Sequence, residues 1–242
     1  MEREVVITAD GSSTIHLPEW DEQYHSKHGA IQEAYHVFIK HGLHHFCNGS
    51  EASKNMTSTA VQKTEGFSKS EVSILEIGFG TGLNAFITLL EAEKLSILVN
   101  YFGVEGYPVA MNEVLQLNYP TQLEANKKEL LFKRMHEVSW DEQHEISKYF
   151  SLTKQKRFFS EINEVEVFNI IYFDAFGARV QPELWTEPVF QKMYNALQEH
   201  GVLVTYAAKG SVRRAMQAVG FLVEKLPGPP GKREMLRATK QF

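Results

Sequence analysis

The sequence predicts an α/β protein with a mostly parallel sheet and helices on both faces of that sheet. From Val72 onward, short apolar segments alternate with amphipathic segments, as in successive βαβ units. The run "VFNIIYFDAF" from Val167 is almost continuously apolar, which is typical of a strand buried on both faces. The stretch "ILEIGFGTGLNAF" from Ile74 joins an apolar strand to a helix through three glycines, as open α/β sheets do at a ligand site.

The composition is that of an ordinary globular protein. The chain has 242 residues, of which 43% are hydrophobic and 23% charged, and this length suits one domain with an appendage. No apolar run approaches the roughly 20 residues that cross a bilayer, and the first residues lack the pattern of a signal peptide. Cys47 is the single cysteine, which excludes an internal disulfide and most cysteine-based metal sites. We therefore expect a cytoplasmic protein with no membrane partner and no metal.

The net charge of −5 is unevenly distributed along the chain. Eight basic and two acidic residues give residues 201–242 a net charge of +6, which leaves −11 for the preceding part. A basic segment on an acidic body can supply a local surface for phosphate groups. The alternative is a set of solvated lysines and arginines that bind no partner.

Residues 1–71 are expected to form a hairpin, a helix and a polar loop that pack on the main domain. The segment "REVVITADGSSTIHL" predicts two short strands around the turn pair Asp10-Gly11. Gly42 is the predicted end of the helix, and the stretch from Cys47 to Val72 is rich in polar residues, as exposed loops are. The apolar residues that recur on one face of the helix are Ile31, Ala34, Tyr35 and Phe38.

Residues 72–242 carry the predicted sheet and its helices. The strands are the apolar segments that begin at Val72, Val99, Val167, Val202 and Phe221. The helices are the amphipathic segments 83–95, 108–118, 188–201 and 211–220, of which the last two end at Gly201 and Gly220. The segment "PGPPGKREML" from Pro227 predicts a turn-rich loop that leads into a further strand.

Three glycines spaced two apart follow the first strand of this sheet: Gly78, Gly80 and Gly82. Glycine weakens regular structure, so this spacing needs a turn or a ligand that requires it. A strand, a glycine turn and a helix form the first unit of nucleotide-binding α/β folds, where the backbone approaches the ligand. The dinucleotide pattern G-x-G-x-x-G would need glycine at Leu83, and the lysine of a P-loop is absent. A tight packing turn is the alternative.

Two carboxylates accompany the glycine turn. Glu76 precedes Gly78 by two residues, as in the E/D-x-G-x-G-x-G turn of S-adenosylmethionine (SAM) methyltransferases. Glu105 ends the second strand, about 20 residues beyond the turn, where an acidic side chain can accept both ribose hydroxyls. The alternative for Glu105 is a solvated carboxylate at the end of a strand.

Asp174 follows the most apolar strand, at the edge of the sheet where open α/β proteins place reactive groups. Its carboxylate could accept a hydrogen bond from a substrate amine, and Phe176 could stack on a planar substrate. The pair resembles, in compressed form, the Asp-Pro-Pro-aromatic loop of amino-methylating enzymes. An aspartate that only caps the next loop is the alternative.

With these residues in view, the chain resembles the methyltransferase domain of the tRNA 5-methylaminomethyl-2-thiouridine biosynthesis family (MnmC-like), in a stand-alone form without the oxidase domain. The resemblance covers nearly the whole chain. It rests on ordered motifs: Glu33 with "VFI", "GFGTGLN" from Gly78, Glu105 with "YP", "FDAF" around Asp174, "PELW" from Pro182, and "VRRAMQAVGF" followed by "GKREML".

The resemblance implies a Rossmann-like SAM-dependent methyltransferase fold without a metal. The implied reaction methylates the aminomethyl group of 5-aminomethyl-2-thiouridine at the wobble position, in the anticodon region of tRNA, with Asp174 as the catalytic residue. We expect SAM to be bound by Glu76, Gly78, Gly80, Gly82, Asn84 and Glu105. We expect the substrate to be bound by Glu33, Phe176, Arg213, Arg214, Lys232 and Arg233. The aminomethyl intermediate must come from another route, and an oxidoreductase partner is one source.

One position departs from the family pattern. Where the family has an acidic residue for the adenine amino group, this sequence has Arg157, so no adenine contact is assigned. Two other functions stay open. A SAM-fold enzyme that acts on a small amine, as a methyltransferase or like a polyamine synthase, fits the same Asp-Ala-Phe stretch. The non-enzymatic alternative is a catalytically inactive SAM-fold domain that acts as an RNA-binding or scaffold module.

Overall fold

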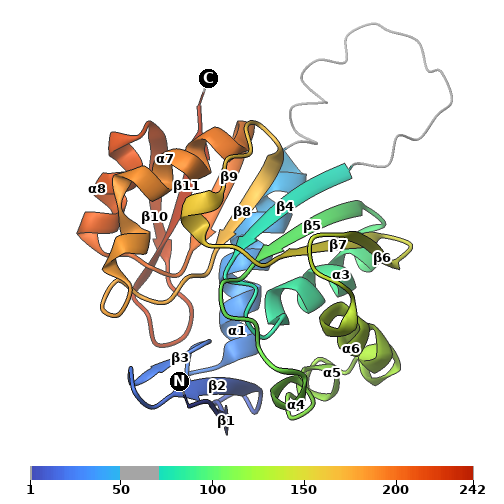
Figure 1. Ribbon diagram of the computed structural model, residues 1–242. Helices are drawn as coiled ribbons and strands as arrows, with labels where there is room; N and C mark the ends of the chain where they lie inside the picture. Colours follow the sequence, from blue (N-terminus) through green and yellow to red (C-terminus); the bar gives the residue numbers. More distant parts are fainter. Residues whose placement is uncertain (1, 50–70, 242) are drawn as a thin grey trace, which may run out of the picture.

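The computed structural model describes residues 2–49 and 71–241, and a mixed sheet forms its centre (Figure 1). Four neighbouring strand pairs in the middle are parallel, whereas the pairs at both edges are antiparallel. The mostly parallel sheet predicted from the alternating pattern is therefore confirmed. In spatial order the eight strands are β10 (Phe221–Pro227), β11 (Glu234–Lys240), β9 (Leu197–Thr205), β8 (Phe168–Phe173), β4 (Glu71–Ile77), β5 (Leu98–Val104), β7 (Phe150–Gln155) and β6 (Gln143–Ser147).

Helices cover both faces of this sheet, as predicted. One hydrophobic cluster joins the sheet to α1 (Ala30–Ala34), the π-helix η1 (Tyr35–His44), α3 (Leu83–Leu95) and α6 (Glu129–Glu137). The other joins it to η4 (Pro182–Trp185), α7 (Glu187–Ala196) and α8 (Gly210–Ala218). Side chains alternate between the two clusters along each strand, so Ile74 of β4 belongs to the first and Leu75 to the second.

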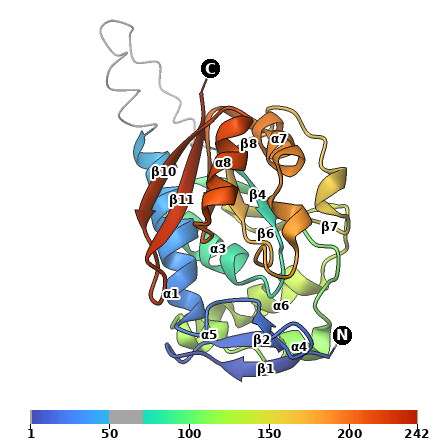
Figure 2. The same cartoon turned by 90° about the vertical axis from the view of Figure 1, so that its left-hand side faces the viewer.

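The N-terminal segment forms the predicted hairpin. β1 (Glu4–Ile7) pairs antiparallel with β2 (Ser13–Leu17), and β3 (Glu22–Gln23) adds a third short strand. This small sheet lies beyond one end of the large sheet, beside α1, α4 (Met111–Val114) and α5 (Tyr119–Gln122), in both views (Figures 1 and 2). Reciprocal hydrogen bonds between Ser13 and Asn118 connect the hairpin to the start of α5.

The prediction that Gly42 ends the N-terminal helix is wrong. η1 continues through Gly42, and residues 45–49 are also helical. A Cβ atom at Gly42 would lie 3.0 Å from Tyr172 and 3.1 Å from Val204, so the missing side chain lets the helix approach β8 and β9 closely. The helix shares one hydrophobic cluster with the sheet. A division of the chain at residue 71 into an extension and a main domain stays a proposal.

Other boundaries also differ from the expectation. The helix predicted for 188–201 ends at Ala196, because the buried Leu197 already pairs with β8, and a register shift in β9 accommodates Gly201. The helix predicted for 108–118 shrinks to α4. Of the predicted loop 47–72, residues 47–49 are helical, 71–72 lie in β4, and the remainder lies outside the described residues.

The C-terminal loop and strand are confirmed as the β10–β11 hairpin, in which β11 inserts between β10 and β9. No helix among the described residues is long and apolar enough to span a membrane.

Candidate active site

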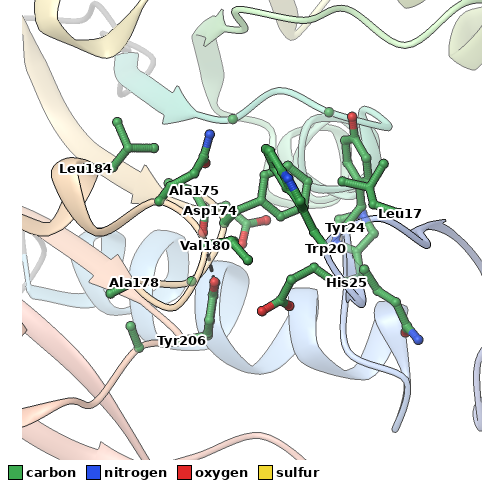
Figure 3. A pocket seen from close by; sticks show the side chains of 18 of the residues that line it. Leu17, Trp20, Tyr24, His25, Asp174, Ala175, Ala178, Val180, Leu184 and Tyr206 are labelled. Carbon is green, nitrogen blue, oxygen red and sulfur yellow. Dashed lines mark hydrogen bonds between the residues drawn. The ribbon is translucent and has the colours of Figure 1, made fainter. Parts of the chain in front are cut away.

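A cavity of about 2050 Å³ opens at the edge of the sheet where its central parallel strands end (Figure 3). The segments after β4, β5, β8 and β9 contribute to its wall, together with the N-terminal segment 17–27 and the β10–β11 hairpin. A pocket for one small molecule usually measures roughly 300–1,000 Å³, so this cavity has room for a cofactor and a second substrate.

The glycine turn after β4 forms one side of the cavity, and backbone conformation explains two of its glycines. Gly78 has φ 90°, and a Cβ atom there would lie 2.8 Å from the carbonyl oxygen of Asp174. Gly80 has φ 48°, and a Cβ atom there would lie 2.9 Å from the ring of Tyr24. Both glycines line the cavity, and their missing side chains let the loop after β8 and the ring of Tyr24 approach the turn closely.

Glu105 follows β5, and two backbone N–H groups hold its carboxylate. Its Oε2 accepts a hydrogen bond of 2.9 Å from the N–H of Gly80, and its Oε1 accepts one of 2.8 Å from the N–H of Tyr107. The carboxylate is nearly buried but lines the cavity. Each carboxylate oxygen has a second acceptor position, so Glu105 can still accept from two ligand hydroxyls.

Three residues expected to bind the cofactor lie behind the cavity wall instead. Gly82 begins α3 with φ 71°, and a Cβ atom there would lie 2.8 Å from the ring of His136. Glu76 and Asn84 are 1% and 2% exposed, and neither they nor Gly82 line the cavity. The side-chain nitrogen of Asn84 donates to Glu76 Oε1 at 2.9 Å and to Asp174 Oδ2 at 2.8 Å.

Asp174 lies in the cavity wall directly after β8. Its N–H donates to the carbonyl oxygen of Ile77, which fixes the start of the loop beside the glycine turn. Burial raises the pKa of Asp174 to about 7 and the charge of Glu33 adds to this rise, while Asn84 and Lys232 oppose it. A carboxyl group with this pKa can accept or release a proton near neutral pH.

Glu33 and Lys232 meet beside Asp174 although 199 positions separate them. Glu33 is 5% exposed in α1, where it accepts a hydrogen bond from the N–H of Ser26 and forms a salt bridge with Lys232. The Lys232 nitrogen also lies 3.6 Å from the centroid of the Tyr206 ring. Lys232 is therefore held by a carboxylate and an aromatic face within the cavity.

Aromatic side chains cover the loop after β8. Phe176 lies edge-on to Trp20 and Tyr24, with ring centroids 5.6 and 5.0 Å apart. Figure 3 shows Trp20 and Tyr24, from the N-terminal segment, facing the side of the cavity that carries Asp174. Sequence reasoning identified Phe176 but missed Trp20 and Tyr24, because no local pattern separates them from aromatics that only pack.

The loop after β8 is anchored at two carbonyl groups. The hydroxyl of Tyr206 donates to the carbonyl oxygen of Ala175 at 2.8 Å (Figure 3). The indole nitrogen of Trp185 donates to the carbonyl oxygen of Phe176 at 2.8 Å. Trp185 belongs to the "PELW" motif, so that motif has a structural task in holding the loop.

The predicted basic residues divide into two groups. Lys232 and Arg233 line the cavity, as does Lys209, which sequence reasoning missed. Arg213 and Arg214 lie on α8 and do not line the cavity.

Arg157 does not face the cavity either. It forms a salt bridge with Glu164 and donates to the side chain of Gln155, whereas its neighbour Phe158 lines the cavity and is 56% exposed. Phe158 is a further residue that the sequence analysis missed. Within residues 2–49 and 71–241, no group of three His, Cys, Asp or Glu side chains is arranged to hold a metal ion.

Known proteins with a similar sequence or structure include SAM-dependent methyltransferases. A family model described as S-adenosyl-L-methionine-dependent methyltransferase matches residues 123–241. The chain is 26% identical over 231 residues to the tRNA 5-methylaminomethyl-2-thiouridine biosynthesis bifunctional protein MnmC of Hydrogenovibrio crunogenus, a match that covers 89% of this chain and 31% of the relative. For the protein of the same name from Leptospira borgpetersenii the identity is 27%, over 90% of this chain and 32% of the relative. The chain thus spans about a third of the length of these curated relatives.

A solved structure agrees with this similarity. MnmC2 from Aquifex aeolicus superimposes with a TM-score of 0.75 and 25% sequence identity, covering 98% of this chain and 70% of that one. The shared fold includes the sheet and its helices, and the cavity with Gly78, Gly80, Glu105 and Asp174 lies at the edge where such folds bind ligands. The chain has the Rossmann-like fold of SAM-dependent methyltransferases, and it is similar over nearly its whole length to about a third of the length of the MnmC proteins.

Proposed function

We propose that this chain transfers a methyl group from SAM to the exocyclic amine of 5-aminomethyl-2-thiouridine at the wobble position of tRNA, giving 5-methylaminomethyl-2-thiouridine. The observation that carries the proposal is the position of Asp174, a carboxyl group with a pKa near 7 in a cavity large enough for two ligands. The names of the MnmC relatives support the choice of tRNA as the substrate.

The residues around the glycine turn fit SAM. Gly78 and Gly80 present bare backbone to the cavity, and Glu105 supplies acceptors for the ribose hydroxyls. Bound SAM supplies an electrophilic methyl group that carries its own leaving group. The protein therefore has to position the amine and remove its proton.

Asp174 is the group that we assign to the amine. A primary alkylamine is mostly protonated at neutral pH, and the ionised carboxylate of Asp174 can accept its proton and orient the free lone pair. The rings of Phe176, Trp20 and Tyr24 line the neighbouring wall, and they can stack on the uracil base.

Charged side chains support binding of the rest of the tRNA. Lys209 and Arg233 at the cavity, with Arg213 and Arg214 on α8, can contact the phosphates of the anticodon region. Lys232 is engaged by Glu33, so we assign both of them to the amine site. We place the reaction in the cytoplasm. We propose an oxidoreductase as the supplier of the aminomethyl group, because the MnmC relatives are named as bifunctional proteins.

The test uses tRNA that carries 5-aminomethyl-2-thiouridine, incubated with the protein and methyl-labelled SAM and then digested to nucleosides. Label should appear in 5-methylaminomethyl-2-thiouridine, and Asp174→Asn should lower the rate about 10²-fold or more while SAM still binds. An unlabelled nucleoside, with SAM binding demonstrated, would reject the tRNA proposal. Label in small aliphatic amines offered in parallel would then favour the small-amine alternative.

A further inference from the structure

Asn84 lies in the first turn of α3, and its amide group links the buried carboxyl group of Glu76 to the half-buried one of Asp174. The same side-chain nitrogen donates to Glu76 Oε1 at 2.9 Å and to Asp174 Oδ2 at 2.8 Å. An amide nitrogen has two hydrogens, so both are used by these two contacts. Asn84 is 2% exposed and does not line the cavity, so it has neither a free donor nor access to a bound cofactor.

We propose that Asn84 is a positioning residue, which holds the carboxylate of Asp174 toward the substrate amine and connects it to Glu76, and that it is not a ligand of SAM. This inference rests on the role proposed above for Asp174. The same inference assigns Glu76 a structural role and no contact with the cofactor. Its carboxyl group accepts a hydrogen bond from the Asn84 amide and so fixes the orientation of that amide.

The geometry explains why the link needs an amide. The two acceptor oxygens share one nitrogen, so the carboxyl groups lie roughly 5 Å apart, where two ionised carboxylates repel each other. Burial raises the pKa of Glu76 well above its usual range, and the charge of Asp174 adds to this effect. The raised pKa of Glu76 favours its protonated form, and Asn84 gives its second hydrogen to the carboxylate of Asp174.

Two polar atoms of this network are left without a partner in the described part of the chain. Asn84 Oδ1 and Glu76 Oε2 are buried and have no hydrogen-bond partner among the described residues. Other titratable groups also act on this network from neighbouring elements. They are Glu33 of α1, Tyr101 of β5, Glu105 after β5, Tyr172 of β8, Tyr206 after β9 and Lys232 of the β10–β11 hairpin.

The consequence concerns the protonation of Asp174. A hydrogen bond to the charged form of a carboxylate favours that form. Without the Asn84 amide, the pKa of Asp174 should rise further, so less of the carboxylate is ionised at pH 7. The orientation of the carboxylate should also be lost, which lowers kcat more than it changes the affinity for SAM.

The experiment measures two quantities on the full chain, the ¹³C carboxyl titration of Asp174, assigned with Asp174→Asn, and the Kd for SAM. Asn84→Ala should raise the titration midpoint and lower kcat about 10- to 100-fold, with the Kd for SAM within about threefold of the wild type. Asn84→Ser provides a second variant that keeps one donor, and we expect its titration midpoint and kcat to lie between the other two.

Thr88→Val is the matched control. Thr88 is fully buried one turn further along α3 and donates to the backbone carbonyl of Asn84 at 2.7 Å, without contact to Asp174. Its substitution should lower stability and leave the midpoint unchanged.

Two results would overturn the inference. One is an unchanged Asp174 titration in both Asn84 variants together with SAM binding weakened tenfold or more, which would make Asn84 a cofactor ligand. The other is an unchanged titration and an unchanged kcat. Because the titration needs no tRNA, it stays informative if the tRNA assay fails, and the two proposals can fail separately.

Discussion

The ammonium nitrogen of Lys232 lies 3.6 Å from the centroid of the Tyr206 ring and forms a salt bridge with the carboxylate of Glu33. Lys232 comes from the β10–β11 hairpin, Tyr206 follows β9, and Glu33 belongs to α1. One cation therefore joins the C-terminal hairpin, the sheet and the N-terminal helix around the cavity. An aromatic face and a carboxylate together make a favourable environment for a positive charge.

Replacing Lys232 with methionine should destabilise the protein by about 1–3 kcal/mol, because the buried carboxylate of Glu33 loses its cation. The free energy of unfolding in urea measures the loss. Lys232→Arg should retain most of the stability, since it keeps the charge.

The same hairpin offers a matched control for this prediction. The salt bridge between Lys225 and Glu234 is largely exposed, with side chains 42% and 31% accessible, so Lys225→Met should cost less than about 1 kcal/mol. An equal decrease in the free energy of unfolding for Lys232→Met and Lys225→Met would show that the buried pair stabilises the protein no more than the exposed pair does.

Asp174 should make stability depend on pH. Its pKa rises from 3.8 to about 7 on folding, so between these values the unfolded chain has released a proton that the folded protein retains. The free energy of unfolding of the wild type should then fall as pH rises through this interval, by at most about 4 kcal/mol. Asp174→Asn removes this penalty.

The stability gained in Asp174→Asn should therefore grow from about pH 4 to pH 7 and level off above pH 7. Urea unfolding across that range measures the gain. Glu199→Gln, at an exposed position of β9, is the control and should show no such growth. A gain for Asp174→Asn that is constant with pH would contradict the raised pKa.

The parts of the site that follow strands directly could be predicted from the sequence. The carboxyl ends of parallel strands meet at one edge of a sheet, so the glycine turn after β4, Glu105 after β5 and Asp174 after β8 had to lie close together. The confirmed sheet and hairpin likewise follow from short-range periodicity.

The remaining features depend on contacts between distant residues. Local sequence predicts that Gly42 ends a helix. In the structure this glycine is required because the helix packs closely on β8 and β9, a contact that local propensity does not encode. Trp20 reaches the cavity only because the hairpin folds back over the sheet edge. Asn84 lies within a recognisable motif, but its task depends on the burial of Glu76 and on Asp174, 90 positions further along.

Glu105 should control the affinity for SAM. In Glu105→Gln the new amide would point at least one N–H toward a backbone donor, either that of Gly80 or that of Tyr107. We expect the Kd for SAM to rise about 10- to 100-fold, because the substitution removes one or two hydrogen bonds between SAM and a charged group. Calorimetric titration with SAM measures the change.

Glu113→Gln is a suitable control for this substitution, because Glu113 lines the same cavity but pairs with Arg3. Its Kd for SAM should stay within about threefold of the wild type. A wild-type Kd in Glu105→Gln would remove Glu105 from the cofactor site.

The basic residues near the cavity should account for the salt dependence of tRNA binding. Each phosphate contact releases counterions, so each contact that is lost lowers the slope of log K against log salt by about 1. The double variant Lys209→Gln/Arg233→Gln should lower the slope by about 2. Arg213→Gln/Arg214→Gln should lower it as well, because α8 carries both cations next to the cavity-lining Lys209.

Filter-binding or fluorescence titrations of tRNA at several salt concentrations provide the slopes. Lys133→Gln on α6 is the control, since this exposed lysine pairs with Glu137 within its own helix and lies outside the cavity. If both double variants keep the wild-type slope while Lys133→Gln lowers it, the tRNA lies over α6 and the basic C-terminal segment is only solvated. A lowered slope in the double variants alone would instead assign the phosphates to the side of the cavity formed by α8 and the β10–β11 hairpin.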